Sequence, residues 1–282
     1  MDGMELKGIA EPRANGIDRS MVSLTPVYDG GFTTYGFSLG ILILDARYPR
    51  VPGDLGNGTT FTYPVVLQAV PNATPRRVVD GDASLLDTFV AAARDLEQQG
   101  VKAITTSCGF LAVFQKEMAS AVRVPVFTSS LIQVPLVQNM LGRGRRVGIL
   151  TADGSCLTEA HFEGVGWSSR EIPVAIQGME PYPNFTGSIL NGGTTLDFEA
   201  VAAEMEDATN RLVRDNPDVG AIVLECTNMP PYAAVVQAAI GLPVFDILTL
   251  SDMVYRTMHR VPTAGPMPSN FLREPPRMTA VS

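Results

Sequence analysis

The stretch Val101–Cys108 (VKAITTSC) returns in similar form as Val219–Cys226 (VGAIVLEC), at an offset of 118 residues. At the same offset, Pro125–Phe127 (PVF) falls on Pro243–Phe245 (PVF) without a gap. One aliphatic strand would mean little by itself, because buried parallel strands are always aliphatic. Here both ends of a helix-containing unit match in register, and a cysteine stands at the strand exit twice. The sequence therefore predicts an internal repeat of two strand–cysteine–helix–strand halves.

Strands and helices are expected to alternate along the rest of the chain as well. Hydrophobic patterning predicts extended runs at residues 37–44, 61–70, 101–106, 124–128, 147–151, 172–176, 219–225 and 243–246. It predicts helices at residues 82–99, 111–122, 131–141, 155–162, 196–215, 231–240 and 249–260. Such alternation indicates crossover connections and mostly parallel sheets, which define the α/β class.

The repeat and the alternation together predict two pseudo-symmetric lobes, each a mostly parallel sheet flanked by helices, with an active-site cleft between them. The first lobe should comprise residues 36–141, completed by the C-terminal helix 248–260. The second lobe should comprise residues 145–247. We expect residues 1–35 to form an N-terminal arm. Residues 261–282, rich in Pro, Ser and Met without periodicity, should form a C-terminal tail.

Composition restricts the possible partners. Lysine and arginine number 21 against 29 acidic residues, which gives a net charge of −8. Without a dense basic stripe the chain offers no footprint for a phosphate backbone, so no nucleic-acid partner is expected. The longest aliphatic run, Leu39–Leu44, is far shorter than the roughly 20 apolar residues of a membrane helix. We therefore expect no membrane partner, and we expect a homo-oligomer whose subunit number the sequence does not define.

The cysteine count and the N-terminus point to a reducing compartment. Three cysteines are few, and an odd number cannot all pair within one chain, so a disulfide scaffold is not expected. The first twenty residues are polar and partly acidic, so no secretory leader is visible. A cytoplasmic protein is expected. With two histidines in the chain, histidine-based metal sites are not expected either.

Cys108 and Cys226 each follow a predicted strand and precede a predicted helix. Ligands of open α/β sheets bind outside the carboxyl ends of the strands, where helix N-termini lower a thiol's pKa and favour carboxylates. Two pseudo-symmetric lobes would direct both sulfurs into one cleft. Opposed thiols suit the removal of a proton α to a carboxylate on one face and its return on the other. One cysteine would be a thiolate base and the other a thiol acid.

Other interpretations of the cysteines stay open at this point. Either cysteine alone fits a small buried core residue, because free cysteine is among the most buried residue types. The pair could form a disulfide between the lobes, which a reducing compartment disfavours. Cys156 lies inside a predicted helix without a counterpart in the repeat, so it is expected to be structural. A non-catalytic protein whose lobes close on a small acid is the alternative class.

Three motifs carry a resemblance to a known family. Thr106–Phe110 (TSCGF), Glu225–Asn228 (ECTN) and the intervening Gly148–Thr151 (GILT) resemble the aspartate/glutamate racemase superfamily, over roughly residues 39–260. The resemblance implies a two-lobed pseudo-symmetric α/β fold, catalytic Cys108 and Cys226, and no pyridoxal phosphate, metal or other cofactor. Members racemise aspartate, glutamate or hydantoins, isomerise maleate or decarboxylate arylmalonates.

The sequence departs from the amino-acid racemases after the first cysteine. They usually carry Asn and Thr there, whereas Gly109 and Phe110 offer only backbone N–H groups. The opening looks more like the branch that includes the algal dimethylsulfoniopropionate lyases. The stretches that carry this resemblance are Leu44–Pro49 (LDARYP), Pro52–Asp54 (PGD) and Phe61–Val65 (FTYPV), together with Cys108–Phe110 (CGF). Those enzymes also use a cysteine to remove a proton α to a carboxylate, and then eliminate dimethyl sulfide to leave acrylate.

Substrate-binding candidates lie at the same strand ends. Arg47 could bind a carboxylate through its guanidinium fork or form a surface ion pair. Glu225 could raise the pKa of Cys226, face a cationic substrate group, or point to the other side of its strand. Thr151 could line the cleft or cap a helix. The remaining candidates are Tyr48 and the two turns, with Gly109, Phe110, Thr227 and Asn228.

The primary hypothesis is a cofactor-independent racemase or isomerase that abstracts the α-proton of a small carboxylic acid with Cys108 and Cys226. The first alternative keeps the same deprotonation but ends in β-elimination, as in the sulfonium lyases. The second is the non-catalytic small-acid binding protein.

Overall fold

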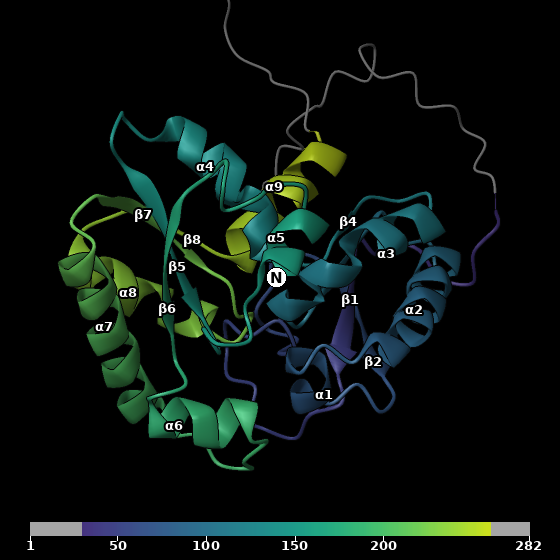
Figure 1. Ribbon diagram of the computed structural model, residues 1–282. Helices are drawn as coiled ribbons and strands as arrows, with labels where there is room; N and C mark the ends of the chain where they lie inside the picture. Colours follow the sequence, from purple (N-terminus) through teal and green to yellow (C-terminus); the bar gives the residue numbers. More distant parts are fainter. Residues whose placement is uncertain (1–29, 261–282) are drawn as a thin grey trace, which may run out of the picture. The chain divides into compact units, whose positions relative to one another are not determined.

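The computed structural model describes residues 30–260, and residues 34–260 belong to one compact unit. The predicted arm (1–35) lies almost entirely outside the described residues, and the predicted tail (261–282) lies wholly outside them. The described chain contains two separate four-stranded sheets, and every strand pair in both is parallel (Figure 1). The predicted two-lobed α/β fold is confirmed.

The first sheet has the strand order β2-β1-β3-β4. Its strands are β1 (Leu39–Leu44), β2 (Val65–Val70), β3 (Ala103–Thr106) and β4 (Val126–Phe127). The helices of this half are α1 (Pro75–Val79), α2 (Leu86–Gln98), α3 (Gln115–Ala121) and α4 (Val134–Met140). Short 3₁₀ turns precede three of them, namely η2 (Ala83–Leu85), η3 (Gly109–Phe114) and η4 (Ser130–Gln133).

The second sheet has the corresponding order β6-β5-β7-β8. Its strands are β5 (Arg146–Thr151), β6 (Val174–Gly178), β7 (Val219–Leu224) and β8 (Val244–Phe245). The helices are α5 (Glu159–Gly164), α6 (Pro183–Phe185), α7 (Phe198–Asp215), α8 (Ala233–Ile240) and α9 (Ile247–Met258). The π-helical turn η5 (Thr186–Leu190) follows α6, and the 3₁₀ turn η6 (Pro230–Tyr232) precedes α8.

The internal repeat extends to the pairing register of the strands. In the first sheet Ile104 pairs with Val126, and in the second Ile222 pairs with Val244. Both partners are displaced by the same 118 residues that relate the two cysteines in the sequence. The two halves are therefore equivalent in strand order and in hydrogen-bonding register, and their cysteines occupy equivalent positions.

One hydrophobic core joins the two sheets. It contains buried residues of both halves, among them Cys108 and Cys226. A second cluster lies where Ile247 and Leu250 of α9 pack with Leu39 and Ile41 of β1. The last helix of the chain therefore covers one face of the first sheet, while α2 packs into the main core. No helix among residues 30–260 is long and apolar enough to cross a bilayer.

The helix expected at residues 155–162 begins later, at Glu159. The Asp153 carboxylate accepts hydrogen bonds from the backbone N–H groups of Ser155 (3.0 Å) and Cys156 (3.2 Å), which holds this segment in a turn. The helix then starts at a capping box on Thr158. Between the strand expected at 172–176 and the helix expected at 196–215, the structure adds a short helical segment formed by α6 and η5.

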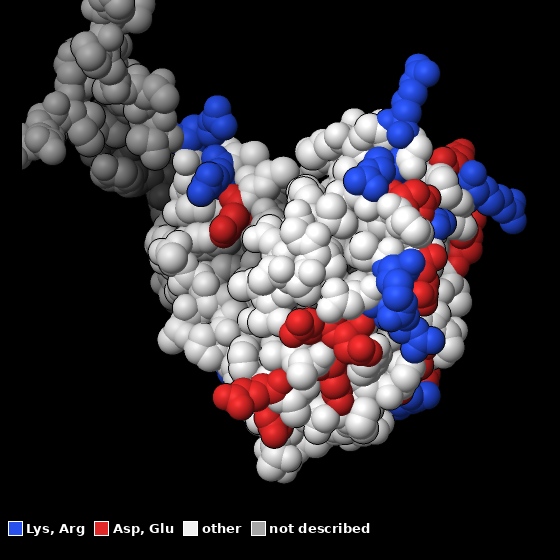
Figure 2. Space-filling model, turned by 90° about the vertical axis from the view of Figure 1, so that its left-hand side faces the viewer, with Lys and Arg blue, Asp and Glu red and all other residues white. Residues whose placement is uncertain are grey.

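Charged side chains are mixed on the face that Figure 2 presents, which is the side of the second lobe. Acidic groups cluster on its lower part, and basic groups stand singly or in small groups among uncharged residues. Several arginines of the described residues are paired with acids; Arg146, for instance, lies 3.0 Å from Asp218. This face carries no continuous basic area.

Candidate active site

The two cysteines end equivalent inner strands. Cys108 follows β3 and precedes η3, while Cys226 follows β7 at the start of the turn that leads to η6. Both are free thiols, and their exposed fractions are only 8% and 7%. The two cysteine turns pack against each other, because Gly109, which follows Cys108, lies against the side chain and the carbonyl group of Glu225, which precedes Cys226. Ionisation of Cys108 would raise the pKa of Cys226. Parallel strands that end at the same edge of each sheet bring the two turns together.

Cys108 has the surroundings better suited to a thiolate. Burial raises its pKa to about 12, and the nearby Glu225 adds to the rise. The backbone N–H groups of Phe110 and Leu111, at the start of η3, lower the pKa of this thiol, and the N–H of Leu111 donates to the backbone carbonyl of Cys108 at 3.2 Å. The Arg50 guanidinium lowers it further. Two N–H donors and one cation thus favour the anionic form of this thiol.

Cys226 is held more firmly as a thiol. Burial raises its pKa well above the ordinary value, and Glu225, Cys108 and Asp54 all raise it further. A single backbone N–H, that of Asn228, acts in the opposite direction. The Cys226 sulfur also donates to the side-chain oxygen of Asn228 at 3.5 Å. The two equivalent cysteines are therefore chemically unequal, and Cys108 is the one that ionises at lower cost.

A polar network brings a buried cation beside Cys108. Nη1 of Arg50 contacts Asp54 at 2.8 Å, and the guanidinium lies 4.7 Å from the ring centre of Tyr48. The Asn228 amide donates to the Tyr48 hydroxyl (3.1 Å) and to Asp54 (2.5 Å). The side chains of Arg50 and Asp54 are only 13% and 4% exposed. The loop after β1 and the Cys226 turn are thereby tied into one site.

Glu225 lies wholly buried between the two cysteine turns. Its Oε2 accepts a hydrogen bond from the Thr151 hydroxyl (2.7 Å), and the backbone N–H of Ala152 also donates to the carboxyl group. Its other oxygen packs so closely on Gly109 that a Cβ there would collide with it. Burial raises the pKa of Glu225 to about 7. Position 109 therefore requires glycine, because any side chain there would occupy the space of this carboxyl group.

Several polar atoms of the site have no partner. Among residues 30–260, five buried side-chain nitrogen or oxygen atoms make no hydrogen bond. Four of them belong to residues of this site or of the turn beside it: Arg50 Nη2, Glu225 Oε1, Thr227 Oγ1 and Tyr232 OH. Because buried polar groups are nearly always hydrogen-bonded in native proteins, such a concentration marks a place for a polar ligand.

Arg47 does not join this site. Its side chain is 80% exposed and lies 3.4 Å from Asp45, which is the surface ion pair that sequence reasoning left open. The guanidinium in the site belongs to Arg50 instead. Sequence reasoning also missed the roles of Asp54 and Tyr232. All three lie in loop or turn segments, and the only signal was the polar Pro52–Asp54 stretch (PGD) within the loop after β1.

The other predicted residues lie in the site, and several are engaged with its own groups. The backbone N–H of Phe110 lowers the pKa of the Cys108 thiol. The side chain of Phe110 packs edge-on against His161. Thr151 contacts Glu225, and Asn228 contacts Tyr48 and Asp54. Thr227 is the predicted substrate-binding residue, besides Glu225, that leaves a buried side-chain atom unpartnered.

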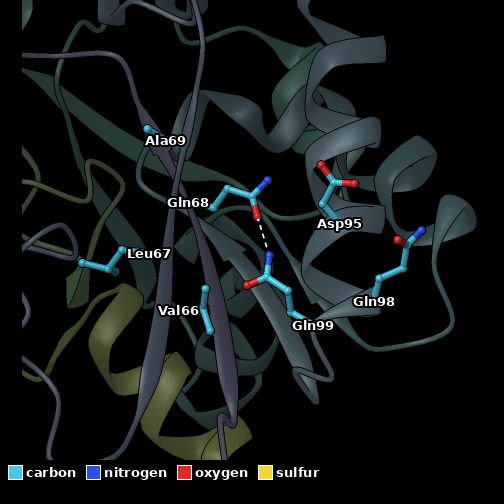
Figure 3. A pocket seen from close by; sticks show the side chains of 7 residues that line it. All are labelled: Val66, Leu67, Gln68, Ala69, Asp95, Gln98 and Gln99. Atoms are coloured by element: carbon cyan, nitrogen blue, oxygen red, sulfur yellow. Dashed lines mark hydrogen bonds between the residues drawn. The ribbon is translucent and has the colours of Figure 1, made fainter. Parts of the chain in front are cut away.

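The cysteines are nearly enclosed, and two hollows of the surface lie away from them. One, with a volume of about 590 Å³, lies between β2 and the end of α2, where the Gln99 amide donates to Gln68 at 3.2 Å (Figure 3). Another, of about 540 Å³, is lined by residues of α5 and η3 and by Cys156. Neither includes Cys108 or Cys226. Within the described residues, no group of three or more His, Cys, Asp or Glu side chains could hold a metal ion.

Two α/β lobes that each end an inner strand in a buried cysteine define the racemase-type class of folds. A family model described as Asp/Glu/Hydantoin racemase matches residues 72–250, and the chain belongs to this family. A solved glutamate racemase from Francisella tularensis, in complex with D-glutamate, aligns with a TM-score of 0.50 and 18% identity. The alignment covers 79% of this chain and 81% of that one, and it shows the shared fold.

Curated relatives in sequence are named as lyases. A dimethylsulfoniopropionate lyase of Durusdinium sp. clade D is 33% identical over 227 residues, 78% of this chain and 74% of the relative. Dimethylsulfoniopropionate lyase 3 of Emiliania huxleyi (strain CCMP1516) is 31% identical over 237 residues, 81% of this chain. The match spans 61% of the length of that lyase. The chain thus has sequence relatives named as lyases and a structural neighbour named as a racemase.

Proposed function

We propose that the protein is a lyase that removes the proton α to the carboxylate of a small acid and then expels a leaving group from the β-carbon. The proposed substrate class is that of dimethylsulfoniopropionate. The observation that carries the proposal is the pair of unequal buried thiols beside a guanidinium whose Nη2 has no partner. The names of the curated relatives support elimination as the outcome.

The substrate carboxylate would bind to the unpartnered donors of the site. Nη1 of Arg50 is committed to Asp54, which leaves Nη2 for a second acid. A planar guanidinium suits this division, because it presents donors in a fixed fork. The hydroxyl groups of Thr227 and Tyr232 would supply further hydrogen bonds. A bound carboxylate held in this way satisfies three groups that are otherwise buried without partners.

Cys108 would act as the base. Its thiolate takes the proton from the α-carbon, and the electron pair of that C–H bond becomes the α–β double bond. The bond from the β-carbon to sulfur then breaks, and its electron pair leaves with the sulfur as dimethyl sulfide. Acrylate remains, and the proton stays on Cys108 until it is released to water. Every step uses side chains of this chain, so we propose no cofactor.

A racemase or isomerase is the second candidate. The observation that favours it is the packing of the two cysteine turns, in which Gly109 lies against Glu225. Cys226, held as a thiol, could return a proton to the carbanion that Cys108 creates. Deprotonation is common to both candidates, and the fate of the carbanion separates them. Elimination needs a leaving group on the β-carbon, whereas racemisation needs a second proton donor.

The test is turnover in deuterated water with a panel of amino acids and dimethylsulfoniopropionate. A lyase should release dimethyl sulfide and acrylate, while a racemase should wash deuterium into recovered substrate as the enantiomer ratio falls. Cys108→Ser should lower either activity by a factor on the order of a hundred to ten thousand. Cys226→Ser should match that loss only for the racemase, and Cys156→Ser is the matched control.

Binding and turnover, measured together, separate an enzyme from a non-catalytic binding protein. In Cys108→Ser, calorimetry should find ligand affinity largely retained although turnover is lost. An activity that survives both Cys108→Ser and Cys226→Ser would refute the cysteine assignment. The absence of any turnover with the whole panel would leave both substrate proposals unsupported.

A further inference from the structure

Glu225 breaks the equivalence of the two halves of the site. At the offset of 118 residues its counterpart is Ser107, which also stands between a strand and a cysteine. Both residues bind the end of the neighbouring strand: the Ser107 hydroxyl accepts the N–H of Leu44 at 2.9 Å, and Glu225 accepts the N–H of Ala152. The shared task needs one acceptor. The carboxyl group of Glu225 supplies a second oxygen that this task does not use.

The second oxygen lies in a place without donors. Oε1 of Glu225 is buried, makes no hydrogen bond and rests on the α-carbon of Gly109, next to Cys108. The Ser130 hydroxyl, which lies nearby, donates to the backbone carbonyl groups of Leu224 and Glu225. A buried carboxylate oxygen without a donor or cation is costly, because desolvation penalises its charge. The complement that it lacks is a positive charge.

Within the site the existing cation is already committed. Arg50 pairs with Asp54 and keeps only Nη2 for a further acid. The site thus combines one unpartnered cationic donor with one unpartnered carboxyl oxygen. A substrate that satisfies both must carry one carboxylate and one cationic group. A second carboxylate, as in aspartate or glutamate, would meet no further cation among the residues that form this site.

We infer that Oε1 of Glu225 binds the cationic group of the substrate, and that this contact selects zwitterionic monocarboxylates over dicarboxylates and uncharged analogues. The inference deepens the proposed function and rests on it for the position of the carboxylate. Burial without a counter-charge also accounts for the raised pKa of Glu225, which a bound cation would lower again. Ser107, its counterpart, has no charge to offer.

Two non-reacting analogues of equal shape provide the test. N,N-dimethyl-β-alanine carries a cationic nitrogen where dimethylsulfoniopropionate has sulfur, and 4-methylpentanoate carries a neutral carbon there. Calorimetry should find that the protein binds the cationic analogue more tightly, by roughly tenfold to a hundredfold. Glu225→Gln keeps an acceptor for Thr151 and Ala152 but removes the charge, so the preference should disappear. Glu206→Gln, an exposed acid on α7, should retain it.

A preference that survives in Glu225→Gln would overturn the inference. A second outcome would also overturn it. If Glu225→Gln changes only the rate at which an alkylating reagent modifies the cysteines, and leaves the preference for the cationic analogue unchanged, Glu225 acts on the thiols and not on the substrate. If the variant fails to fold, the pH dependence of the preference for the cationic analogue in the wild-type protein tests the inference instead. The groups that face Glu225 and titrate are the thiols of Cys108 and Cys226, and both stay neutral in this range.

In the wild-type protein the preference should therefore grow between about pH 6 and pH 8, as Glu225 ionises, while 4-methylpentanoate binds with little change. A preference that is flat across this range would contradict the inference. The product assay is independent of these measurements. If the protein releases no dimethyl sulfide but prefers the cationic analogue, the lyase proposal fails and the assignment of Glu225 stands.

Discussion

Replacement of Arg50 by lysine should weaken substrate binding while leaving the fold nearly intact. Nη1 of Arg50 contacts Asp54 at 2.8 Å, and Nη2 is buried without a partner. Lysine keeps the positive charge but has a single nitrogen on a flexible stem. That nitrogen can pair with Asp54, or it can reach a substrate carboxylate, but it cannot do both in the geometry of the fork.

The expected loss is one charge-assisted hydrogen bond. Such a bond contributes about 1.5–3 kcal/mol, so KM should rise by roughly tenfold to a hundredfold. Arg50→Met should behave differently, because it leaves the buried Asp54 without its cation. Breaking a buried pair costs about 3–5 kcal/mol, which at roughly 2–4 °C per kcal/mol lowers Tm by about 6–20 °C. Lysine separates the binding role of Arg50 from its structural one.

Steady-state kinetics with dimethylsulfoniopropionate and thermal unfolding of the same preparations provide the assay. Arg47→Ala is the matched control, since that side chain is 80% exposed and pairs only with Asp45 on the surface. It should leave both KM and Tm unchanged. The reasoning is refuted if Arg50→Lys keeps the wild-type KM, or if Arg47→Ala raises KM to the same extent.

Two further predictions concern stability. A Cβ on Gly164 of α5 would lie 3.0 Å from the carbonyl carbon of Ala112 in η3, so Gly164→Ala should cost about 1–3 kcal/mol, and an unchanged Tm would contradict this packing. The pKa of Glu225 rises from 4.5 to about 7 on folding, so the folded state favours its protonated form. Stability should therefore be fully present below about pH 4.5 and fall by on the order of 3 kcal/mol as pH rises through 7. Urea unfolding should show this fall in the wild type and not in Glu225→Gln; equal slopes in both would contradict it.

The fold could be predicted from the sequence because of the internal repeat. Cys108 and Cys226 stand at the ends of strands whose partners Pro125–Phe127 and Pro243–Phe245 repeat at the same offset. Strand pairing in the structure follows this offset residue for residue. Local sequence and long-range pairing agree here because parallel strands of a crossover unit are fixed by the lengths of strand, helix and loop.

The polar residues around the two cysteines could not be predicted from the sequence in the same way. Arg47 and Arg50 lie in one loop without periodicity, and nothing local distinguishes the exposed guanidinium from the buried one. The choice is made by Asp54 together with Asn228, which is distant in sequence. Glu225 illustrates the opposite case. Alternation along β7 left its direction open, and the contact with Gly109 across the two halves decided it.

The exchange of serine for glutamate between the two halves has a stereochemical consequence. A methylene group held between flanks of unlike charge meets two different environments, so its pair of mirror-related hydrogens is no longer interchangeable. In this chain, a substrate labelled with deuterium at one of the two positions should either lose all of the label or keep all of it.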